Sequence, residues 1–211
     1  MEKEFGEIVL KSLNMQPLSF PNVSASTFMK KDLIRKGNLM LKKIISGGKS
    51  GVELAALDAA IRLEIPHEGW CYRNRKTDAG ILPKHYNVKE IENPSYFERL
   101  EKNIIDSDGT VVLTYGQMPV GSKAVKNLAD NYNKPLLNIN LGNHSLDHTV
   151  ALIQKWMTKH AIKTIYFTGS KTGRGRNKKI YDEVIQVIEG VCGVKREKFF
   201  GFEEVADDTN T

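Results

Sequence analysis

The chain has 211 residues, of which 40% are hydrophobic and 27% are charged, and its formal net charge is +6. This composition is typical of a soluble globular protein, and the positive charge favours an anionic partner such as nucleic acid, a phosphorylated metabolite or an oxyanion. No apolar run approaches the roughly 20 residues that a membrane-spanning helix needs, and the N-terminus "MEKEFGEIVL" does not resemble a secretory signal, so we expect a cytoplasmic protein with no membrane association.

Hydrophobic periodicity divides the chain into three parts. Residues 1–38 show no sustained pattern and are interpreted as an N-terminal extension with no assigned structure. Residues 39–194 alternate apolar runs with helical patterns and predict one domain, whereas residues 195–211 are interpreted as a C-terminal tail. The cysteines Cys71 and Cys192 are far apart in the sequence, and two free thiols are favoured over one disulfide.

The elements predicted within the domain alternate between strands and helices. In chain order they are a strand over 40–46, a helix over 52–64, a short strand over 69–72, a helix over 94–106, a strand over 109–116, a helix over 122–133, a strand over 134–141, a helix over 146–160, a strand over 163–169 and a helix over 178–190. In the helix over 94–106, Phe97, Leu100 and Ile104 are predicted to face inward. Continuous apolar strands that alternate with helices predict an α/β fold of the Rossmann-like, doubly wound type, with a mainly parallel sheet and helices on both faces.

The stretch "SGGKSG", residues 46–51, joins the first strand to the first helix. It is not a Walker loop, because Lys43 stands where that motif needs glycine, and Ser46 stands where the dinucleotide fingerprint needs one. Its glycines can still let backbone N–H groups approach an anion at a helix N-terminus. We therefore interpret it as a phosphate-binding loop, and the alternative is a tight turn without a ligand. The predicted ligand-binding residues here are Gly47, Gly48, Lys49, Ser50 and Gly51.

Four other loops contribute candidate residues. Gly116 and Gly121 in "YGQMPVGSKAV" precede a helix and form a second candidate anion site, which we expect to face "SGGKSG" across one cleft. The alternative is that this loop is a plain connection without a ligand. "DSDGTVVL" precedes a strand and can be only a turn. "TGSKTGRGRNKK", which includes Ser170 and Lys171, is interpreted as a phosphate or oxyanion grip rather than a solvated surface, and Arg73 and Arg75 of "CYRNRKTDAG" are expected to close over the same cleft.

Several long stretches resemble one known family. They are "SGGKSGVELAALDAAIRLEIPHEGWC", "ILPKHY", "YFERLEKNIIDSDGTVVLTYG" and "PVGSKAVKNLADNYNKPLL". Together they resemble the "putative molybdenum carrier" family, the circularly permuted YpsA-like branch of the SLOG superfamily, with LOG and DprA proteins as relatives; the resemblance runs from about Ile44 to Val191. It implies a Rossmann-like fold that binds a nucleotide or a nucleotide-derived phosphorylated ligand, with molybdenum cofactor, a phosphate-bearing pterin, as one possibility. It also implies a homo-oligomer, either a dimer or a tetramer.

The resemblance assigns positions to the family's pattern. The matching residues are Gly47, Gly48, Gly51, Trp70, Asn103, Ser107, Asp108, Gly109, Gly121, Ser122 and Gly169. The sequence departs from the pattern at Glu53-Leu54, where the family has Asp-Arg, at "VGS" where it has "GGT", and at "YFTGSK" where it has "NVAGPR". These departures fall on the loops that would select the ligand.

The sequence favours a binding protein, a carrier or sensor, over an enzyme. LOG-type phosphoribohydrolases carry "PGGxGTxxE", and here "PVGSKAVKN" places Asn127 near the position of the glutamate. His144 and His148 have i,i+4 spacing without a third ligand, so neither catalytic nor metal-binding residues are predicted. The alternatives are a LOG-type nucleotide hydrolase or glycosidase, and a DprA-like nucleic-acid-binding protein.

Overall fold

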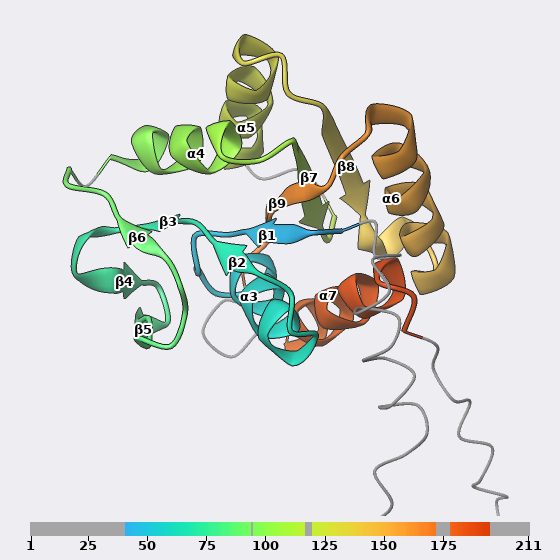
Figure 1. The fold of residues 1–211 in the computed structure, drawn as a ribbon, viewed down its shortest axis with the longest axis horizontal. Coiled ribbons are helices and arrows are strands. Elements are labelled where there is room, and N and C mark those ends of the chain that lie inside the picture. The colour runs from blue at the N-terminus through green and yellow to red at the C-terminus, as the bar shows by residue number, and fades with distance from the viewer. Residues whose placement is uncertain (1–40, 94, 117–119, 172–177, 195–211) are drawn as a thin grey trace, which may run out of the picture. The chain divides into compact units, whose positions relative to one another are not determined.

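The computed structural model of the protein describes residues 41–93, 95–116, 120–171 and 178–194. The predicted extension over 1–38 and the predicted tail over 195–211 lie outside these residues. At the centre is a five-stranded parallel sheet with the strand order β2-β1-β9-β7-β8 (Figure 1). Its strands are β1 Lys43–Ile45, β2 His67–Glu68, β7 Gly109–Thr114, β8 Leu136–Asn140 and β9 Thr164–Gly169.

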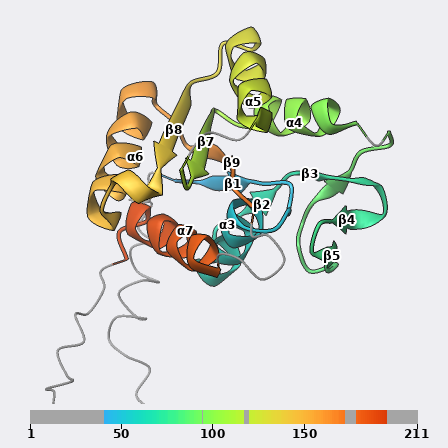
Figure 2. The same ribbon diagram turned by 180° about the vertical axis from the view of Figure 1, so that it is seen from behind.

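Helices cover both faces of this sheet. On one face lie α3 (Val52–Arg62), α6 (Leu146–His160) and α7 (Lys178–Val191), and on the other lie α4 (Tyr96–Ile105) and α5 (Val120–Asn131) (Figures 1 and 2). The predicted Rossmann-like α/β fold is therefore confirmed. Within the described residues, no helix combines the length and the apolar character needed to cross a membrane.

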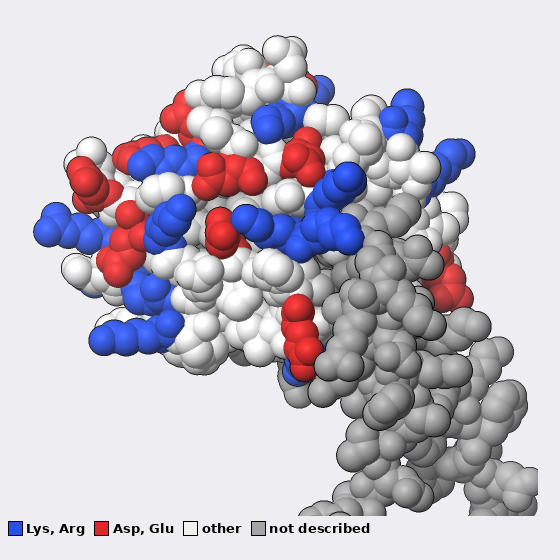
Figure 3. All heavy atoms as spheres, in the orientation of Figure 1, with Lys and Arg blue, Asp and Glu red and all other residues white. Residues whose placement is uncertain are grey.

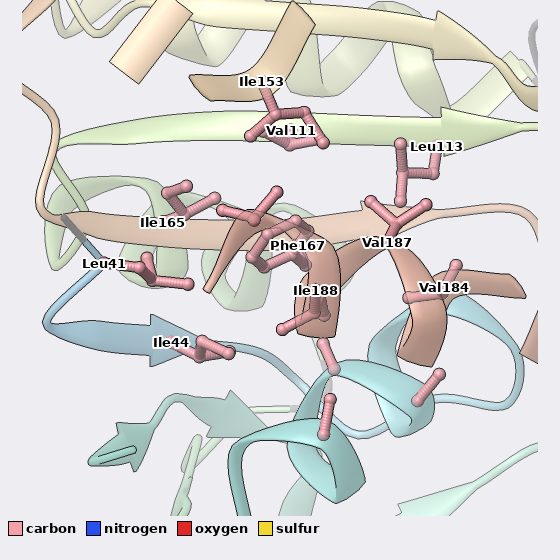
Figure 4. Packing of buried hydrophobic residues seen from close by; sticks show 14 of the residues in the cluster. Leu41, Ile44, Val111, Leu113, Ile153, Ile165, Phe167, Val184, Val187 and Ile188 are labelled. Carbon is pink, nitrogen blue, oxygen red and sulfur yellow. The ribbon is translucent and has the colours of Figure 1, made fainter. Parts of the chain in front are cut away.

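The central strands β1, β7 and β9 are mostly apolar because helices cover both of their faces. Side chains alternate between the faces of a sheet, so neighbouring residues of one strand enter different cores. Val111 and Phe167 pack with α3, α6 and α7 (Figure 4), whereas their neighbours Val112 and Tyr166 pack with α4 and α5. The central strands are thus buried on both faces, and the loops that follow them remain accessible to a ligand.

Smaller elements surround the sheet. β3 (Trp70–Cys71) pairs in parallel with β6 (Lys89–Glu90), and β4 (Lys76–Thr77) pairs with β5 (Gly80–Ile81) as an antiparallel hairpin. Two 3-10 helices, Arg73–Arg75 and Leu141–Asn143, complete the described elements. The short strand predicted over 69–72 therefore exists, but outside the main sheet. The sequence did not indicate β2, because a two-residue strand has no detectable periodicity.

One predicted core position is wrong. Leu100 and Ile104 of α4 are buried, but the Phe97 side chain is 61% exposed. Phe97 lies in the first turn of α4, where its main ring contact is edge-on with Tyr96, at 5.7 Å between ring centroids. Tyr96, its neighbour in the same turn, packs against the core instead.

Both cysteines are free thiols, as predicted, and both are buried. Burial raises the pKa of the Cys71 thiol, and it raises the pKa of Cys192 to about 12. Because the thiolate is the reactive form, we expect a disulfide reagent at pH 8 to modify both at least roughly a hundredfold more slowly in the native protein than in urea. Rapid native labelling at either position, read by mass spectrometry, would contradict this burial.

Candidate functional site

A cavity of about 540 Å³ lies where β1, β7 and β9 end. In parallel strands these ends share one edge of the sheet, and the loops that follow them converge there. Lys49 and Ser50 line the cavity after β1, Gly121 lines it from the start of α5, and Ser170 and Lys171 line it after β9. The predicted meeting of "SGGKSG" and "VGSKAV" at one cleft is confirmed by this arrangement.

The loop after β1 is held in place by main-chain hydrogen bonds. Gly51 precedes α3 with φ 80°, and α3 has no side-chain N-cap. Instead, the Val52 N–H donates to the Ser170 carbonyl oxygen at 3.2 Å, and the Leu54 N–H donates to the Lys49 carbonyl oxygen at 2.8 Å. The loop after β9 therefore takes part in starting α3, which places Lys49 and Ser170 at the same cavity.

The floor of the cavity contains a buried ion pair. Arg99 donates from Nη1 to Glu53 Oε2 at 2.9 Å and from Nη2 to Glu53 Oε1 at 3.2 Å. Glu53 Oε1 also accepts hydrogen bonds from the hydroxyls of Thr168 (2.9 Å) and Tyr166 (3.3 Å), and Oε2 accepts one from the Lys49 N–H (3.1 Å). Burial opposes ionisation of Glu53, but the combined effect of Arg99 and Lys49 is larger and keeps the pKa of this carboxyl below its usual value.

Arg99 has one buried nitrogen without a hydrogen-bond partner in the described part of the chain. Its side chain is 1% exposed, it lines the cavity, and its buried Nε has no hydrogen-bond partner in the described structure. Gly47 provides the space for its guanidinium, because a Cβ at Gly47 would lie 1.8 Å from Arg99 Nη1. Buried donors are nearly always paired in native proteins, and the Arg99 Nε is an exception among the described residues.

Lys49 points into this site rather than into solvent. Its Nζ lies 5.0 Å from the centroid of the Tyr72 ring and 4.9 Å from that of the Tyr96 ring. Partial burial and the nearby charge of Arg99 lower the pKa of Lys49. The ammonium group is therefore partly stripped of water, which strengthens any interaction that it makes with an anion.

Ser50 binds a carboxylate from the β4–β5 hairpin. The Ser50 N–H donates to Asp78 Oδ1 at 3.0 Å and its hydroxyl donates to Oδ2 at 2.8 Å. Lys171 Nζ lies 3.8 Å from the same Oδ2. Partial burial raises the pKa of Asp78, but the hydrogen bonds from Ser50 and the charge of Lys171 have the larger combined effect, so the pKa is below its usual value.

Three predicted site residues lie at the other end of the sheet. Ser107, Asp108 and Gly109 are at the start of β7, whereas the cavity is at the ends of the strands. Asp108 Oδ2 accepts the N–H groups of Lys163 (2.9 Å) and Thr164 (2.7 Å), and Ser107 donates to the Ile104 carbonyl. These residues organise the entries to β7 and β9, and the interpretation of "DSDG" as a turn is the better one.

Other predicted residues have structural partners nearby. The Asn103 amide bonds both the N–H and the carbonyl of Trp70, and the Trp70 indole donates to Asp106. The Arg75 guanidinium donates to the carbonyls of Leu82, Val88, Pro83 and Tyr86. Arg73 is exposed beside Glu90 and Glu92, in a shallow pocket separate from the main cavity. Neither arginine closes over the main cavity.

The glycines have distinct roles. Gly48 has φ +73°, and a Cβ there would lie 2.5 Å from Leu82 Cδ2. Valine at position 48 would therefore strain the backbone and displace the Leu82 side chain. The Gly116 N–H donates to Asn140 Oδ1, and Gly169 lines the cavity. The side chain of Ser122 lies outside the described part of the structure.

His144 and His148 stack their rings, with 4.9 Å between centroids. Among the described residues, no group of three or more His, Cys, Asp or Glu side chains is placed to hold a metal ion. The two histidines therefore form a ring contact near the start of α6.

Comparison with known proteins identifies a family for most of the chain. The model of the circularly permutated YpsA SLOG family matches residues 44–192. The chain belongs to this family. A crystal structure named "Putative molybdenum carrier protein", from Syntrophus aciditrophicus SB, is similar to this SLOG protein with 35% sequence identity and a TM-score of 0.68, over 72% of this chain and 95% of that one. A comparison with curated proteins gives no significant match.

Several residues of this SLOG site were not predicted from the sequence. They are Glu53, Tyr72, Asp78, Tyr96, Arg99, Tyr166 and Thr168. Glu53 was noted only as a departure from the family's pattern, although an acid in the first turn after a Gly-rich loop is a detectable signal. Arg99 had no such signal, since its partner Glu53 is 46 residues away in the sequence.

Proposed function

We propose that this SLOG protein binds a nucleotide or a nucleotide-derived phosphorylated ligand in the cavity and acts as a carrier or sensor. One observation carries the proposal: cationic side chains from three separate elements, Lys49, Arg99 and Lys171, converge on one cavity of about 540 Å³. Lys49 and Lys171 would contact the phosphate, and Arg99, which is paired with Glu53, would lie in the cavity wall beside the ligand.

The dimensions and the walls of the cavity support a small organic ligand. Ligand pockets typically enclose roughly 300–1,000 Å³ and combine apolar walls with a few polar groups. Here Val112, Val125 and the ring of Tyr96 supply apolar surface beside the charged residues. A flat heterocycle, either a nucleobase or a pterin, would fit such walls, with its phosphate at Lys49 and Lys171.

The similar protein is named as a molybdenum carrier, and we propose a phosphate-bearing pterin of the molybdenum-cofactor type as one member of the ligand class. In that case this chain would recognise the phosphate and the pterin ring through the residues named above. A homo-oligomeric state and a cytoplasmic location remain predictions, from the family resemblance and from the composition.

The site supports binding more than cleavage of a glycosidic bond. The acid at the cavity, Glu53, accepts hydrogen bonds from Arg99, Thr168, Tyr166 and the Lys49 N–H, and its pKa is lowered. A carboxylate held ionised in this way is a poor proton donor for a leaving group. Asn127, at the position of the LOG glutamate, is exposed on α5.

The face of the protein that Figure 3 shows gives little support to nucleic-acid binding. On the face shown in Figure 3, acidic side chains are interspersed among the lysines and arginines of the described residues. A duplex-binding surface usually presents a continuous basic area to the phosphate backbone. This face therefore favours the small-ligand proposal.

The test is calorimetry with nucleotides, NAD-derived compounds and molybdopterin, combined with chromatography of the products. We expect binding without turnover, and we expect Lys49→Met to weaken it about tenfold, through loss of a charge-assisted contact worth about 1.4 kcal/mol. Lys159→Met, which removes an exposed lysine on α6, is the matched control and should bind as the wild type does.

Three results would overturn the proposal. Cleavage of the ligand would favour a hydrolase. Binding by Lys49→Met as tight as that of the wild type would show that the ligand binds outside this cavity. Binding of single-stranded DNA alone, with a steep salt dependence, would favour a nucleic-acid-binding protein.

A further inference from the structure

The main-chain N–H groups of the loop after β1 already bind two carboxylates of the protein itself. The Lys49 N–H donates to the Glu53 carboxylate at 3.1 Å, and the Ser50 N–H donates to the Asp78 carboxylate at 3.0 Å. The Glu53 side chain is only 5% exposed, whereas the Asp78 side chain is 32% exposed. The two carboxylates thus differ in how readily a ligand could replace them.

Asp78 sits at the tip of a hairpin whose root is fixed. Arg75 anchors the root by donating to four main-chain carbonyls, and Leu82 is buried against Leu57 and Cys71. The tip is exposed, with Ile81 at 74%. Residues 77–81 are joined to the rest of the domain by the pairing of Ile81 with Lys76 and by the contacts of Asp78 with Ser50 and Lys171.

We propose that Asp78 is an internal anion that occupies the phosphate position of the cavity rim and is displaced when the ligand binds. The inference rests on the proposed function and narrows its ligand class to phosphate monoesters. With Asp78 in place, Lys171 and the Ser50 donors are engaged by one negative charge at 3.8, 3.0 and 2.8 Å. A doubly charged phosphate gains more from these donors than a singly charged diester does, and an uncharged nucleoside gains nothing from them.

Three ligands that share a base separate the effect of phosphate charge from that of the base. They are AMP, a phosphate monoester; cyclic AMP, a singly charged diester; and adenosine, which has no phosphate. Asp78→Asn keeps the size of the side chain but removes the competing charge. Calorimetry should show AMP binding about tenfold more tightly to Asp78→Asn than to the wild type, a smaller gain for cyclic AMP, and less than about a twofold change for adenosine.

Asp130→Asn is the matched control. It removes the same charge from an exposed position at the C-terminal end of α5, the end opposite Gly121 and the cavity, and it should bind all three ligands as the wild type does. Asp78→Ala, which also removes the acceptor oxygens, should give the same order of affinities if the protein melts within a few degrees of the wild type.

Displacement of the hairpin has its own readout. Lys76 is exposed in β4, and trypsin should cleave after it faster in wild-type protein saturated with AMP, and faster in Asp78→Asn without ligand. Equal AMP binding by wild type and Asp78→Asn, or unchanged cleavage at Lys76, overturns the inference and leaves the proposed function intact. If neither protein binds AMP or any other phosphorylated compound of the panel, the proposed function itself is wrong.

Discussion

Replacing Arg99 with methionine is expected to lower the free energy of unfolding by about 3–5 kcal/mol, because the Glu53 carboxylate would stay buried without its counter-ion. The pair is almost completely enclosed, with exposed fractions of 1% for the Arg99 side chain and 5% for that of Glu53. Urea unfolding monitored by circular dichroism measures the difference. Lys102→Met is the control on the same helix, since Lys102 pairs with Glu98 at a partly exposed position and its loss should cost less than about 1 kcal/mol.

The same pair predicts a dependence on pH. The pKa of Glu53 is lowered in the folded state, so its stabilising effect is fully present above the unfolded carboxyl pKa of about 4.3 and is lost as pH falls through the lower, folded-state pKa. Glu53→Gln lacks this ionisation. The difference in unfolding free energy between wild type and Glu53→Gln should therefore be large at pH 7 and shrink below about pH 4.

A difference that stays constant down to the acid limit would show that Glu53 is not ionised in the folded protein. A loss of less than about 1 kcal/mol in Arg99→Met would show that the pair is hydrated rather than buried.

Replacing Gly169 with alanine is expected to cost about 3 kcal/mol or more. Gly169 ends β9 with φ +148°, and a Cβ there would lie 1.9 Å from the Leu113 carbonyl oxygen, on the paired strand β7. A main-chain atom cannot rotate away, so the two central strands would have to separate in addition to the strain of the disfavoured backbone angle. Because Ser170 and Lys171 follow directly and line the cavity, ligand binding should fall together with stability.

Gly80→Ala separates strain from collision. Gly80 also has a positive φ, +120°, but no atom lies within 4 Å of a Cβ placed there. This variant should lose only about 1 kcal/mol. If urea unfolding gives equal losses for the two variants, the contact between β7 and β9 is not what requires glycine at position 169.

Local sequence determined most of the fold, because hydrophobic periodicity reports directly which face of an element is buried. The helix predicted over 146–160 is α6 without change, and the helix predicted over 178–190 is α7 within one residue. The apolar strands that alternate with the helices along the chain indicated a sheet covered on both faces. The Gly-rich loop was correctly placed at the cavity because the same periodicity showed that it follows a strand and precedes a helix.

Only the tertiary structure decided which polar residues form the site. Glu53 and Arg99 are 46 residues apart and Ser50 and Asp78 are 28 apart, and no local pattern specifies such long-range pairs. "DSDG" and "SGGKSG" look alike as polar, glycine-containing turns, yet one precedes a strand and the other follows one. In a parallel sheet these positions lie at opposite ends of the strands. Strand direction, rather than composition, therefore brought Lys49, Gly121 and Lys171 together and left Asp108 at the other end of the sheet.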